Sequence, residues 1–448
     1  MKKIDLARNA AVRIVYRVLR EGAYSNIALK EELDKGKLER LDKALVTEIV
    51  NGTLRNLTRI DWITTRFIKA KRIDPWIEDI IRCGIYQILF LDRVPDSAVC
   101  NESAELARKH GHEGAVRFVN GVLRNISRSK ENPEYPDKSK NAAGYLSVFY
   151  SHPEWIVRKW IKDYGMEFTE ALLNANNEKP PFTIRCNRLR IEKEELIAVL
   201  SEEGIECADG SYNAEAIHIR ATSSIETKES FKKGYYQVQD ESSMLVAHIA
   251  DPKPGDRILD ICSAPGGKTT HMAELMDNKG EVVARDIYGH KLRLVEENCV
   301  RLGVSIVRTE LHDAMVIDES SLERFDKVLL DAPCSGLGVM RRKPDLRWKK
   351  EPDNFKELAE MQRKMLKLAS GYVKPGGKLL YSTCTINRTE NNDIVRDFIS
   401  NNNGFQLESI IGQLPEKLVC ESAYQGFLEL YPNIHGTDGF YIAKMEKR

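Results

Sequence analysis

The first third of the chain has hydrophobic residues at the spacing of an α-helix. In residues 8–20, apolar side chains recur at Ile14, Val15 and Val18, and arginines lie on the opposite side. Apolar residues that recur every three or four positions form one face of a helix. Because the same spacing continues to about residue 130, residues 1–130 are predicted to form an all-α domain.

The pattern becomes mixed after a polar segment that contains two prolines. This segment, 127–141, has the composition of a linker. In 145–235, a helix-like stretch is followed by an alternating, strand-like stretch and a second helix, which predicts a small α+β module. The strand-like stretch carries Arg185, Arg188 and Arg190, which either contact phosphates or simply occupy an exposed strand edge.

From residue 236 onward, strand-like and helix-like segments alternate. This alternation predicts a mainly parallel sheet with helices on both faces over residues 236–448. Strands are predicted at 257–262, 281–286, 305–311, 325–331 and 378–384. Ligands of such sheets bind beyond the carboxyl ends of the strands, so residues at those ends are the first candidates for function.

Composition excludes several classes of protein. The 448 residues contain no apolar run that approaches the roughly 18 residues of a membrane span. The first residues lack the apolar core of a secretory signal, so we expect a cytoplasmic protein. Nine cysteines without a C-x-x-C pair indicate neither a zinc framework nor a disulfide scaffold, so we expect reduced thiols and no bound metal.

Charge is unevenly distributed along the chain, although the net charge is only +1. Residues 1–130 hold 25 Lys and Arg against 17 Asp and Glu, a net charge of +8, and the remainder has a net charge of −7. A basic amino-terminal third fits the backbone of RNA. A solvated helical surface would have the same composition, so composition alone leaves both interpretations open.

The segment "DICSAPGGKTT" resembles a phosphate-binding P-loop but departs from it. That motif requires G-x-x-x-x-G-K-[ST], and here Cys262 occupies the position of its first glycine while Pro265 lies inside the loop. Gly266 and Gly267 still allow backbone to approach a ligand closely. We therefore interpret the segment as a cofactor turn rather than a triphosphate site, with a P-loop NTPase as the rival.

Acidic residues lie at four successive strand ends: Asp260, Asp286, Asp313 and Asp331. Asp286 follows Gly267 by 19 residues, a spacing suited to hydrogen bonds with ribose hydroxyls. An acidic rim would repel a triphosphate, and it suits a cationic nucleoside such as S-adenosylmethionine. The alternative is that each acid only caps the helix that follows it.

Two cysteines follow the last two predicted strands. Cys334 comes just after 325–331 and Cys384 ends 378–384, so a parallel sheet places both over one crevice. Carbon 5 of a pyrimidine accepts a methyl group only after a thiolate has added to carbon 6. Chemistry alone does not decide which thiol attacks. The other cysteines outside the turn are expected to be buried spectators: Cys83, Cys100, Cys186, Cys207, Cys299 and Cys420.

Three motifs in this order resemble those of the RNA cytosine-5 methyltransferases: "DICSAPGGKTT", "DAPCSGLGVMRRKPDLRW" and "YSTCTINRTENN". An amino-terminal domain similar to the NusB antitermination fold narrows the resemblance to bacterial 16S ribosomal RNA enzymes of the RsmB type (Sun or Fmu). The likeness covers nearly the whole chain. Ser263 stands where the family often has alanine, and "INRTENN" lacks a proline that is common before Glu-Asn.

The resemblance implies a multidomain fold and a set of site residues. The expected order is a NusB-like RNA-binding domain (1–130), a small α+β RNA-binding module (145–235) and a Rossmann-like catalytic domain (236–448). Cys384 would be the nucleophile, and Cys334 would assist release of the methylated RNA. S-adenosylmethionine would be bound by Cys262, Ser263, Ala264, Pro265, Gly266, Gly267, Lys268, Asp286, Asp313 and Asp331. Asp331 and Lys268 would also reach the target base.

The resemblance further implies a target, which is one cytosine of 16S ribosomal RNA, as in the enzymes that methylate cytosine 967. We expect a monomer without an obligate protein partner, a metal or a membrane. Whether it acts on naked RNA or on an assembling subunit stays open. The alternatives are a transfer RNA cytosine-5 methyltransferase and a non-enzymatic RNA-binding or antitermination protein.

Overall fold

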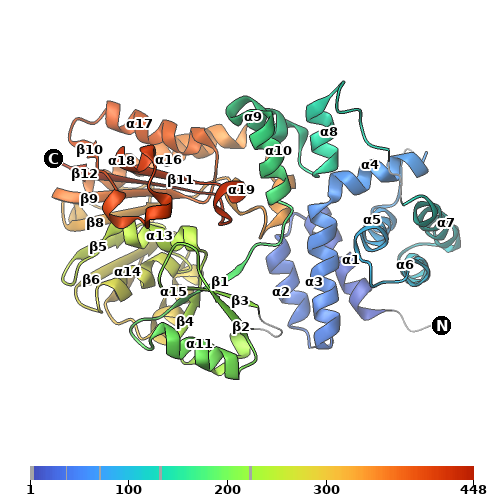
Figure 1. Cartoon of the computed structure of the whole chain (residues 1–448), viewed down its shortest axis with the longest axis horizontal. Helices are drawn as coiled ribbons and strands as arrows, with labels where there is room; N and C mark the ends of the chain where they lie inside the picture. Colours follow the sequence, from blue (N-terminus) through green and yellow to red (C-terminus); the bar gives the residue numbers. More distant parts are fainter. Residues whose placement is uncertain (1–4, 37, 70–71, 131–133, 221–224) are drawn as a thin grey trace. The chain divides into compact units, whose positions relative to one another are not determined.

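The computed structural model describes residues 5–36, 38–69, 72–130, 134–220 and 225–448 (Figure 1). Residues 131–133, within the predicted linker, and residues 221–224, within the predicted α+β module, lie outside the described residues. The chain divides into two compact units. Unit 1 comprises Met1–Glu178 and Met340–Lys350, and unit 2 comprises Lys179–Val339 and Glu351–Arg448.

Unit 1 is helical, as predicted for residues 1–130. Its helices are α1 (Leu6–Arg20), α2 (Ser25–Leu33), α3 (Arg40–Arg55), α4 (Leu57–Phe67), α5 (Pro75–Phe90), α6 (Asp96–His110), α7 (Glu113–Ser129), α8 (Ala142–Phe149), α9 (Glu154–Tyr164) and α10 (Met166–Ala175). Helix α5 is buried along most of its length and packs against α1, α3, α6 and α7, which explains its nearly continuous apolar sequence. Among the described residues, no helix is both long and apolar enough to cross a membrane.

A segment that follows the Pro-Cys motif completes unit 1. Residues 340–350 include the 3-10 helix η4 (Pro344–Trp348). Arg347 is fully buried there and donates hydrogen bonds to the carbonyl oxygens of Arg55 (3.1 Å), Ser151 (3.1 Å) and Asn176 (2.7 Å). The sequence placed these residues in the catalytic domain, and it placed α8–α10 at or next to the α+β module, whereas the structure groups all of them with the helical unit.

Unit 2 begins with the small α+β module. Its antiparallel sheet has the order β2-β3-β1-β4. The elements are β1 (Phe182–Cys186), α11 (Lys193–Glu202), β2 (Glu206–Asp209), β3 (Ala216–Arg220), α12 (Glu229–Lys232) and β4 (Tyr236–Val238). Alternate residues of β1 and β3, such as Ile184 and Ile217, pack with Leu196 and Leu200 of α11 in one small core. The predicted α+β module is therefore confirmed.

The rest of unit 2 is built on a larger sheet with the order β10-β12-β9-β8-β5-β6-β7, and β11 pairs with β12. Its elements are α13 (Glu241–Ala250), β5 (Arg257–Asp260), α14 (Gly267–Leu275), β6 (Glu281–Asp286), α15 (Gly289–Leu302), β7 (Val307–Leu311), β8 (Phe325–Asp331), α16 (Asn354–Gly371), β9 (Val373–Thr383), α17 (Asn392–Ser400), β10 (Phe405–Leu407), α18 (Glu421–Tyr424), β11 (Phe427–Leu430), α19 (Pro432–His435) and β12 (Phe440–Lys447). Strands β5 to β9 pair in parallel, which confirms the Rossmann-like prediction. The antiparallel strands β10, β11 and β12 were not predicted.

Successive strand residues face opposite sides of this sheet. Ile258 and Leu329 pack with α13, α14 and α15, whereas Leu259 and Leu330 pack with α16 and α17. This alternation follows from the period of two along a strand, and Figure 1 shows the two groups of helices on either side of the sheet. With both faces covered, ligands have access to the edge where the carboxyl ends of the parallel strands lie.

The buried guanidinium of Arg347 generates a first prediction. Replacing Arg347 with Ala leaves several buried carbonyl oxygens without donors, and each such group costs about 1–3 kcal/mol. We expect Arg347→Ala to lower the Tm of the protein by roughly 5 °C or more. Thermal unfolding followed by circular dichroism measures this. Lys343→Ala changes an exposed side chain in the same segment and should leave the Tm unchanged; equal Tm values for both variants would contradict the role of Arg347.

Candidate active site

A tight turn joins β5 to α14. The strand ends at Asp260 and the helix begins at Gly267. Between them, Gly266 has φ +97°, which glycine adopts without steric cost, and its N–H donates to the Ser263 carbonyl (2.7 Å). The N–H of Ser263 donates in turn to the Arg285 carbonyl of β6 (2.9 Å). The turn is thus fixed to the neighbouring strand, with its backbone at the carboxyl edge of the sheet.

Asp260 is a buried acid with one unsatisfied oxygen. Its Oδ2 accepts a hydrogen bond from the Thr269 hydroxyl (2.7 Å). Its Oδ1 is buried and has no hydrogen-bond partner among the described residues. Burial, together with the charges of Asp331 and Asp286, raises the pKa of Asp260 to about 7. A buried carboxylate oxygen without a donor is costly, so this position favours a ligand that brings a donor or a positive charge.

Two further acids of the predicted rim, Asp286 and Asp313, each close a turn. Asp286 is buried, and its Oδ1 accepts from the N–H of Tyr288 (3.0 Å). Asp313 accepts in the same way from the N–H of Met315 (2.9 Å). The N–H of His312 donates to the carbonyl of Asp286 (3.2 Å), which places the segment of Asp313 beside it. Neither acid caps a helix, because the N-cap of α15 is Tyr288 and the N-cap of the next 3-10 helix is Asp318. The capping interpretation is therefore wrong for both, and each turn uses only one of the two carboxylate oxygens.

Lys268 and Asp331 form an ion pair next to the cysteines. Lys268 Nζ lies 2.7 Å from Asp331 Oδ2, and Asp331 Oδ1 accepts from the Ser382 hydroxyl (2.7 Å). Burial alone would lower the pKa of Lys268, but the Asp331 carboxylate, and to a lesser extent Cys384, raise the pKa above its usual value. Lys268 therefore keeps its positive charge at neutral pH, and it lies beside the thiol of Cys384.

The two cysteines meet at the ends of adjacent parallel strands. Strand β8 pairs with β9 so that Asp331 lies opposite Ser382, and the Sγ atoms of Cys334 and Cys384 lie 3.4 Å apart. The hydrogen bond with Cys384, followed by burial, raises the pKa of Cys334 well above its usual value. Burial and the hydrogen bond within the pair thus disfavour a thiolate at Cys334.

Glu390 holds the loops that carry both cysteines, a role that sequence reasoning missed. It ends the 3-10 helix η5 (Arg388–Glu390) and is fully buried. Its carboxylate accepts from the N–H (2.8 Å) and hydroxyl (2.5 Å) of Ser335, from Asn387 Nδ2 (2.8 Å) and from Gln362 Nε2 (3.2 Å). The signal was present in the sequence, because Glu390 is the glutamate of the "TENN" motif.

The remaining cysteines differ partly from expectation. Cys83, Cys100, Cys186 and Cys299 are buried, as predicted, but Cys207 is half-buried and Cys420 is exposed. Cys420 is the N-cap residue of the short helix α18, and its Sγ lies 3.2 Å from the Ser422 hydroxyl oxygen. Cys262 in the turn is half-buried, and burial together with nearby acids raises the pKa of its thiol, so it is not an activated nucleophile.

A cluster of Glu215, His248 and His271 lies outside the cysteine site. Its ligand atoms are close enough to hold a metal ion. Glu215 Oε1 already lies 2.6 Å from His248 Nε2 and 3.1 Å from His271 Nε2, so hydrogen bonds account for the cluster. Burial, and then the positive charge of Arg185, lower the pKa of His271 to about 3. The positive charge of Arg185 also disfavours a metal ion at this cluster. The absence of a bound metal stays a prediction.

The buried carboxyl of Asp260 generates a prediction on pH dependence. In the folded protein Asp260 keeps its proton up to about pH 7, whereas an unfolded aspartate titrates near 3.9. Its protonation therefore stabilises the fold fully below about pH 4, and this stabilisation is lost as the pH rises to about 7. We expect the Tm of Asp260→Asn, relative to wild type, to be higher at pH 8 than at pH 4.5.

Thermal unfolding across this pH range, without added ligand, measures the effect. Glu297→Gln removes an exposed acid from α15 and serves as the control, with a Tm difference that stays constant with pH. Parallel curves for wild type and Asp260→Asn would contradict the raised pKa.

Comparisons with known proteins match three successive parts of the chain to known families. Residues 247–446 match the family described as 16S rRNA methyltransferase RsmB/F. Residues 5–128 match the NusB family, and residues 152–226 match the ferredoxin-like domain of RsmF/B-like methyltransferases. The three matches follow the order of the predicted domains.

Relatives and solved structures extend the likeness over the full length. The chain is 40% identical over 451 residues to the probable ribosomal RNA small subunit methyltransferase B of Bacillus subtilis, and 31% identical over 453 residues to the ribosomal RNA small subunit methyltransferase B of Klebsiella pneumoniae; each comparison covers 100% of both chains. It is similar to the crystal structure of PH0851 (TM-score 0.83, 29% identity, 98% of this chain and 99% of that one). It is also similar to NSun6 from Pyrococcus horikoshii with SFG (TM-score 0.59, 27% identity, 65% and 97%). The chain therefore belongs to the RsmB/RsmF family of 16S rRNA methyltransferases, as its sequence motifs predicted.

Proposed function

We propose that this protein transfers a methyl group from S-adenosylmethionine to carbon 5 of a cytosine in small-subunit ribosomal RNA. The observation that carries the proposal is the pair of thiols 3.4 Å apart beside Lys268 and Asp331. Methyl transfer to an oxygen or to an exocyclic nitrogen does not require a thiol, because those atoms are nucleophilic without the addition of a thiolate to the ring. The names of the full-length relatives support methyl transfer and ribosomal RNA, and SFG, an S-adenosylmethionine analogue, in the similar NSun6 structure supports the cofactor.

The carboxyl edge of the sheet fits this cofactor. The turn from Cys262 to Lys268 would hold it, with Asp286, Asp313 and Asp331 around it. The unsatisfied Oδ1 of Asp260 and the acidic surroundings favour a cationic nucleoside, and a triphosphate would be repelled. When bound, S-adenosylmethionine supplies an electrophilic methyl group.

The residues of the chain would carry out the rest of the chemistry. The thiolate of Cys384 adds to carbon 6 of the base, and the ammonium of Lys268 beside it favours the thiolate. Carbon 5 then becomes nucleophilic and takes the methyl group. Water would accept the proton on carbon 5, the double bond between carbons 5 and 6 would reform, and the electron pair of the broken C–S bond would leave with Cys384 as its thiolate. Cys334, whose thiol lies 3.4 Å from that of Cys384, would assist by donating its S–H to the leaving sulfur.

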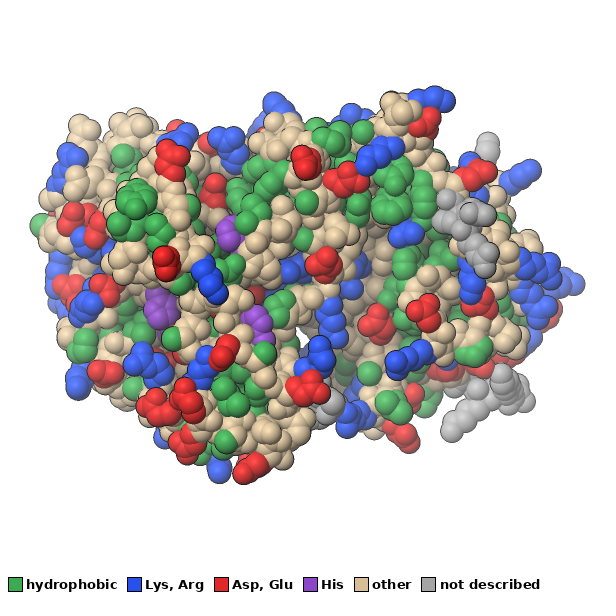
Figure 2. Space-filling model, in the orientation of Figure 1, with side chains coloured by type: hydrophobic (Ala, Val, Ile, Leu, Met, Phe, Trp, Pro, Cys, Tyr) green, Lys and Arg blue, Asp and Glu red, His purple; other side chains and the backbone are tan. Residues whose placement is uncertain are grey.

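The target base must be unpaired or extruded, because stacking covers the faces of its ring. We assign the handling of RNA to the NusB-like domain (1–130) and the ferredoxin-like module (145–235). Lys and Arg side chains are interspersed with Asp and Glu over the face in Figure 2. Cytosine 967 as the target, a monomeric state and a cytoplasmic location remain predictions.

Covalent trapping tests the assignment of the two thiols. Wild type, Cys334→Ala and Cys384→Ala are incubated with unmodified small-subunit ribosomal RNA and S-adenosylmethionine and then denatured. We expect a protein–RNA adduct that accumulates in Cys334→Ala, because release is impaired, and is absent in Cys384→Ala. A denaturing gel measures it, with the exposed Cys420→Ala as the matched control. An adduct that persists only in Cys384→Ala would show that Cys334 is the nucleophile. An adduct that forms only with transfer RNA would show that transfer RNA is the substrate.

The buried carboxylate of Glu390 generates a further prediction. In Glu390→Gln, the new amide NH2 faces donors of Ser335, Asn387 or Gln362 that the carboxylate accepts. We expect both cysteine loops to shift, and methyl transfer to fall about 10-fold or more, which a tritium-transfer assay measures. Glu416→Gln, at an exposed position, is the control. A wild-type rate in Glu390→Gln would contradict its role in holding the loops.

A further inference from the structure

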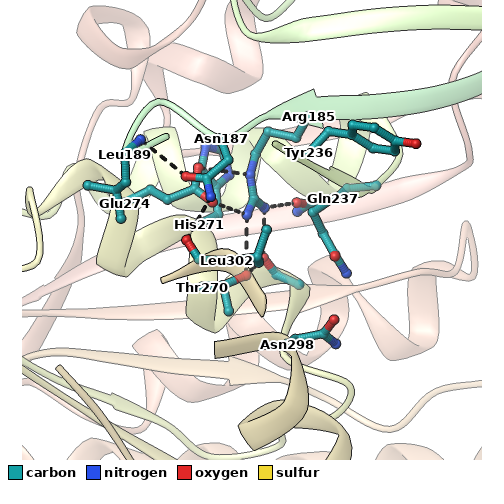
Figure 3. Close-up of polar contacts among 12 residues, drawn as sticks. Arg185, Asn187, Leu189, Tyr236, Gln237, Thr270, His271, Glu274, Asn298 and Leu302 are labelled. Carbon is teal, nitrogen blue, oxygen red and sulfur yellow. Dashed lines mark hydrogen bonds and ion pairs between the residues drawn. The ribbon is translucent and has the colours of Figure 1, made fainter. Parts of the chain in front are cut away.

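Arg185 of β1 projects from the ferredoxin-like sheet onto α14, the helix that follows the cofactor turn (Figure 3). Its side chain is fully buried. Nε and Nη2 donate to the carboxylate of Glu274 (3.2 and 2.6 Å), and Nη2 also donates to the Thr270 hydroxyl (3.2 Å). Nη1 donates to the Gly267 carbonyl (2.9 Å) and to Gln239 Oε1. All N–H groups of the guanidinium are used, so the expectation that Arg185 contacts phosphates or occupies an exposed edge is wrong.

The arrangement is poorly explained by stability alone. Burial raises the pKa of Glu274 even against the attraction of Arg185, which shows that the buried carboxylate is costly. A buried ion pair generally contributes less to the stability of the fold than an apolar pair of the same size. What an arginine adds is a planar fork that fixes the direction of several hydrogen bonds at once. The guanidinium therefore suits a role in fixing geometry.

The geometry that Arg185 fixes is the first turn of α14. Gly267 and Thr270 belong to this turn and bracket Lys268, whose ammonium pairs with Asp331. The turn follows directly on the cofactor loop, so a shift of the Gly267 carbonyl moves both the loop and Lys268. Arg185 thereby acts on the ligand site from a sheet that does not itself carry the site.

A second polar link runs from the same sheet to the loop. Arg301 of α15 donates to the carbonyl of Tyr236 in β4 (2.9 Å) and to Asn298 Oδ1 (3.1 Å). Asn298 Nδ2 donates in turn to the carbonyl of Pro265 inside the loop (2.9 Å). Figure 3 draws Tyr236 and Asn298 in the same view as Arg185. The loop is thus tied to the ferredoxin-like sheet at Pro265 and at Gly267.

We propose that the ferredoxin-like sheet supports the cofactor loop, and that Arg185 is a positioning residue that sets the affinity for S-adenosylmethionine. The proposal rests on the proposed function, because it takes the 262–268 turn as the cofactor site. It gives the module a task besides the handling of RNA. Changes at Arg185 should therefore affect the binding of the cofactor far more than the binding of RNA.

The test uses the full chain with both charges of the pair replaced, Arg185→Met with Glu274→Leu. Removing both partners avoids leaving one charge buried and unpaired. Because Gln239 Oε1 and the Gly267 carbonyl each lose a donor, the Tm is measured first and binding is compared at a temperature at which the variant is folded. Calorimetric titration with S-adenosylmethionine alone should show binding about 10-fold weaker or more, as for other positioning residues. The KM for S-adenosylmethionine should rise with it, while the affinity for a ribosomal RNA fragment changes less than about 2-fold.

Two further variants separate positioning from general stability. Arg185→Lys keeps the positive charge but loses the planar guanidinium. Its affinity for S-adenosylmethionine should lie between those of wild type and the double variant. Arg257→Met with Glu281→Leu removes a pair (2.9 Å) at the amino ends of β5 and β6, far along the strands from the turn, and it should leave cofactor affinity unchanged.

The outcomes distinguish the two proposals. Wild-type binding of S-adenosylmethionine in the Arg185→Met, Glu274→Leu variant would overturn the inference and leave the proposed function standing. Equal weakening in the double variant and in the Arg257 control variant would also overturn it, because the effect would then be one of general stability. If wild type itself bound no S-adenosylmethionine, both proposals would fail.

Discussion

The parallel pairing of β8 with β9 is the constraint on which the site depends. Because Asp331 lies opposite Ser382, the residues that follow the two strands leave the sheet side by side, and their thiols come within 3.4 Å of each other. The same pairing lets Ser382 and Lys268 share the carboxylate of Asp331. A shift of one residue in register would turn each side chain to the other face and separate these groups.

Burial makes this small group of side chains unequal. Burial raises the pKa of Asp260, and the bond to Cys384 together with burial raises that of Cys334, whereas Asp331 keeps Lys268 charged. A thiolate is thus disfavoured at Cys334, while Cys384 lies beside the positive charge of Lys268. Environments that push the pKa values of neighbouring groups apart are a common sign of divided chemical roles. Glu390 and Arg185 lie behind the residues of the site. Their side chains form hydrogen bonds to the backbone that carries those residues.

The spacing of apolar residues along the chain predicted many of the helices and strands. Contacts between residues far apart in the sequence could not be predicted in this way. Strands β6 and β8 occupy the predicted residues, because each carries a short run of buried apolar residues, 282–284 and 328–330, as buried parallel strands do. The order of strand ends then placed both cysteines together. Arg185 was misread because its partner Glu274 lies 89 residues away, and residues 340–350 were misplaced because nothing local shows that the chain returns to unit 1. Sequence chemistry left the choice of nucleophile open, and the assignment of Cys384 rests on the family resemblance, supported by the charge of Lys268 beside it.

The most direct test of the central claim is the mass of the peptide attached to RNA. Ribosomal RNA in which 5-fluorocytidine replaces cytidine would retain the covalent intermediate, since carbon 5 then has no proton to lose. After incubation with S-adenosylmethionine and digestion with protease and nuclease, tandem mass spectrometry identifies the modified residue. Our account predicts a methylated fluoropyrimidine nucleotide on the peptide that contains Cys384. A methyl group on RNA without any adduct, or an adduct confined to Cys334, would contradict it.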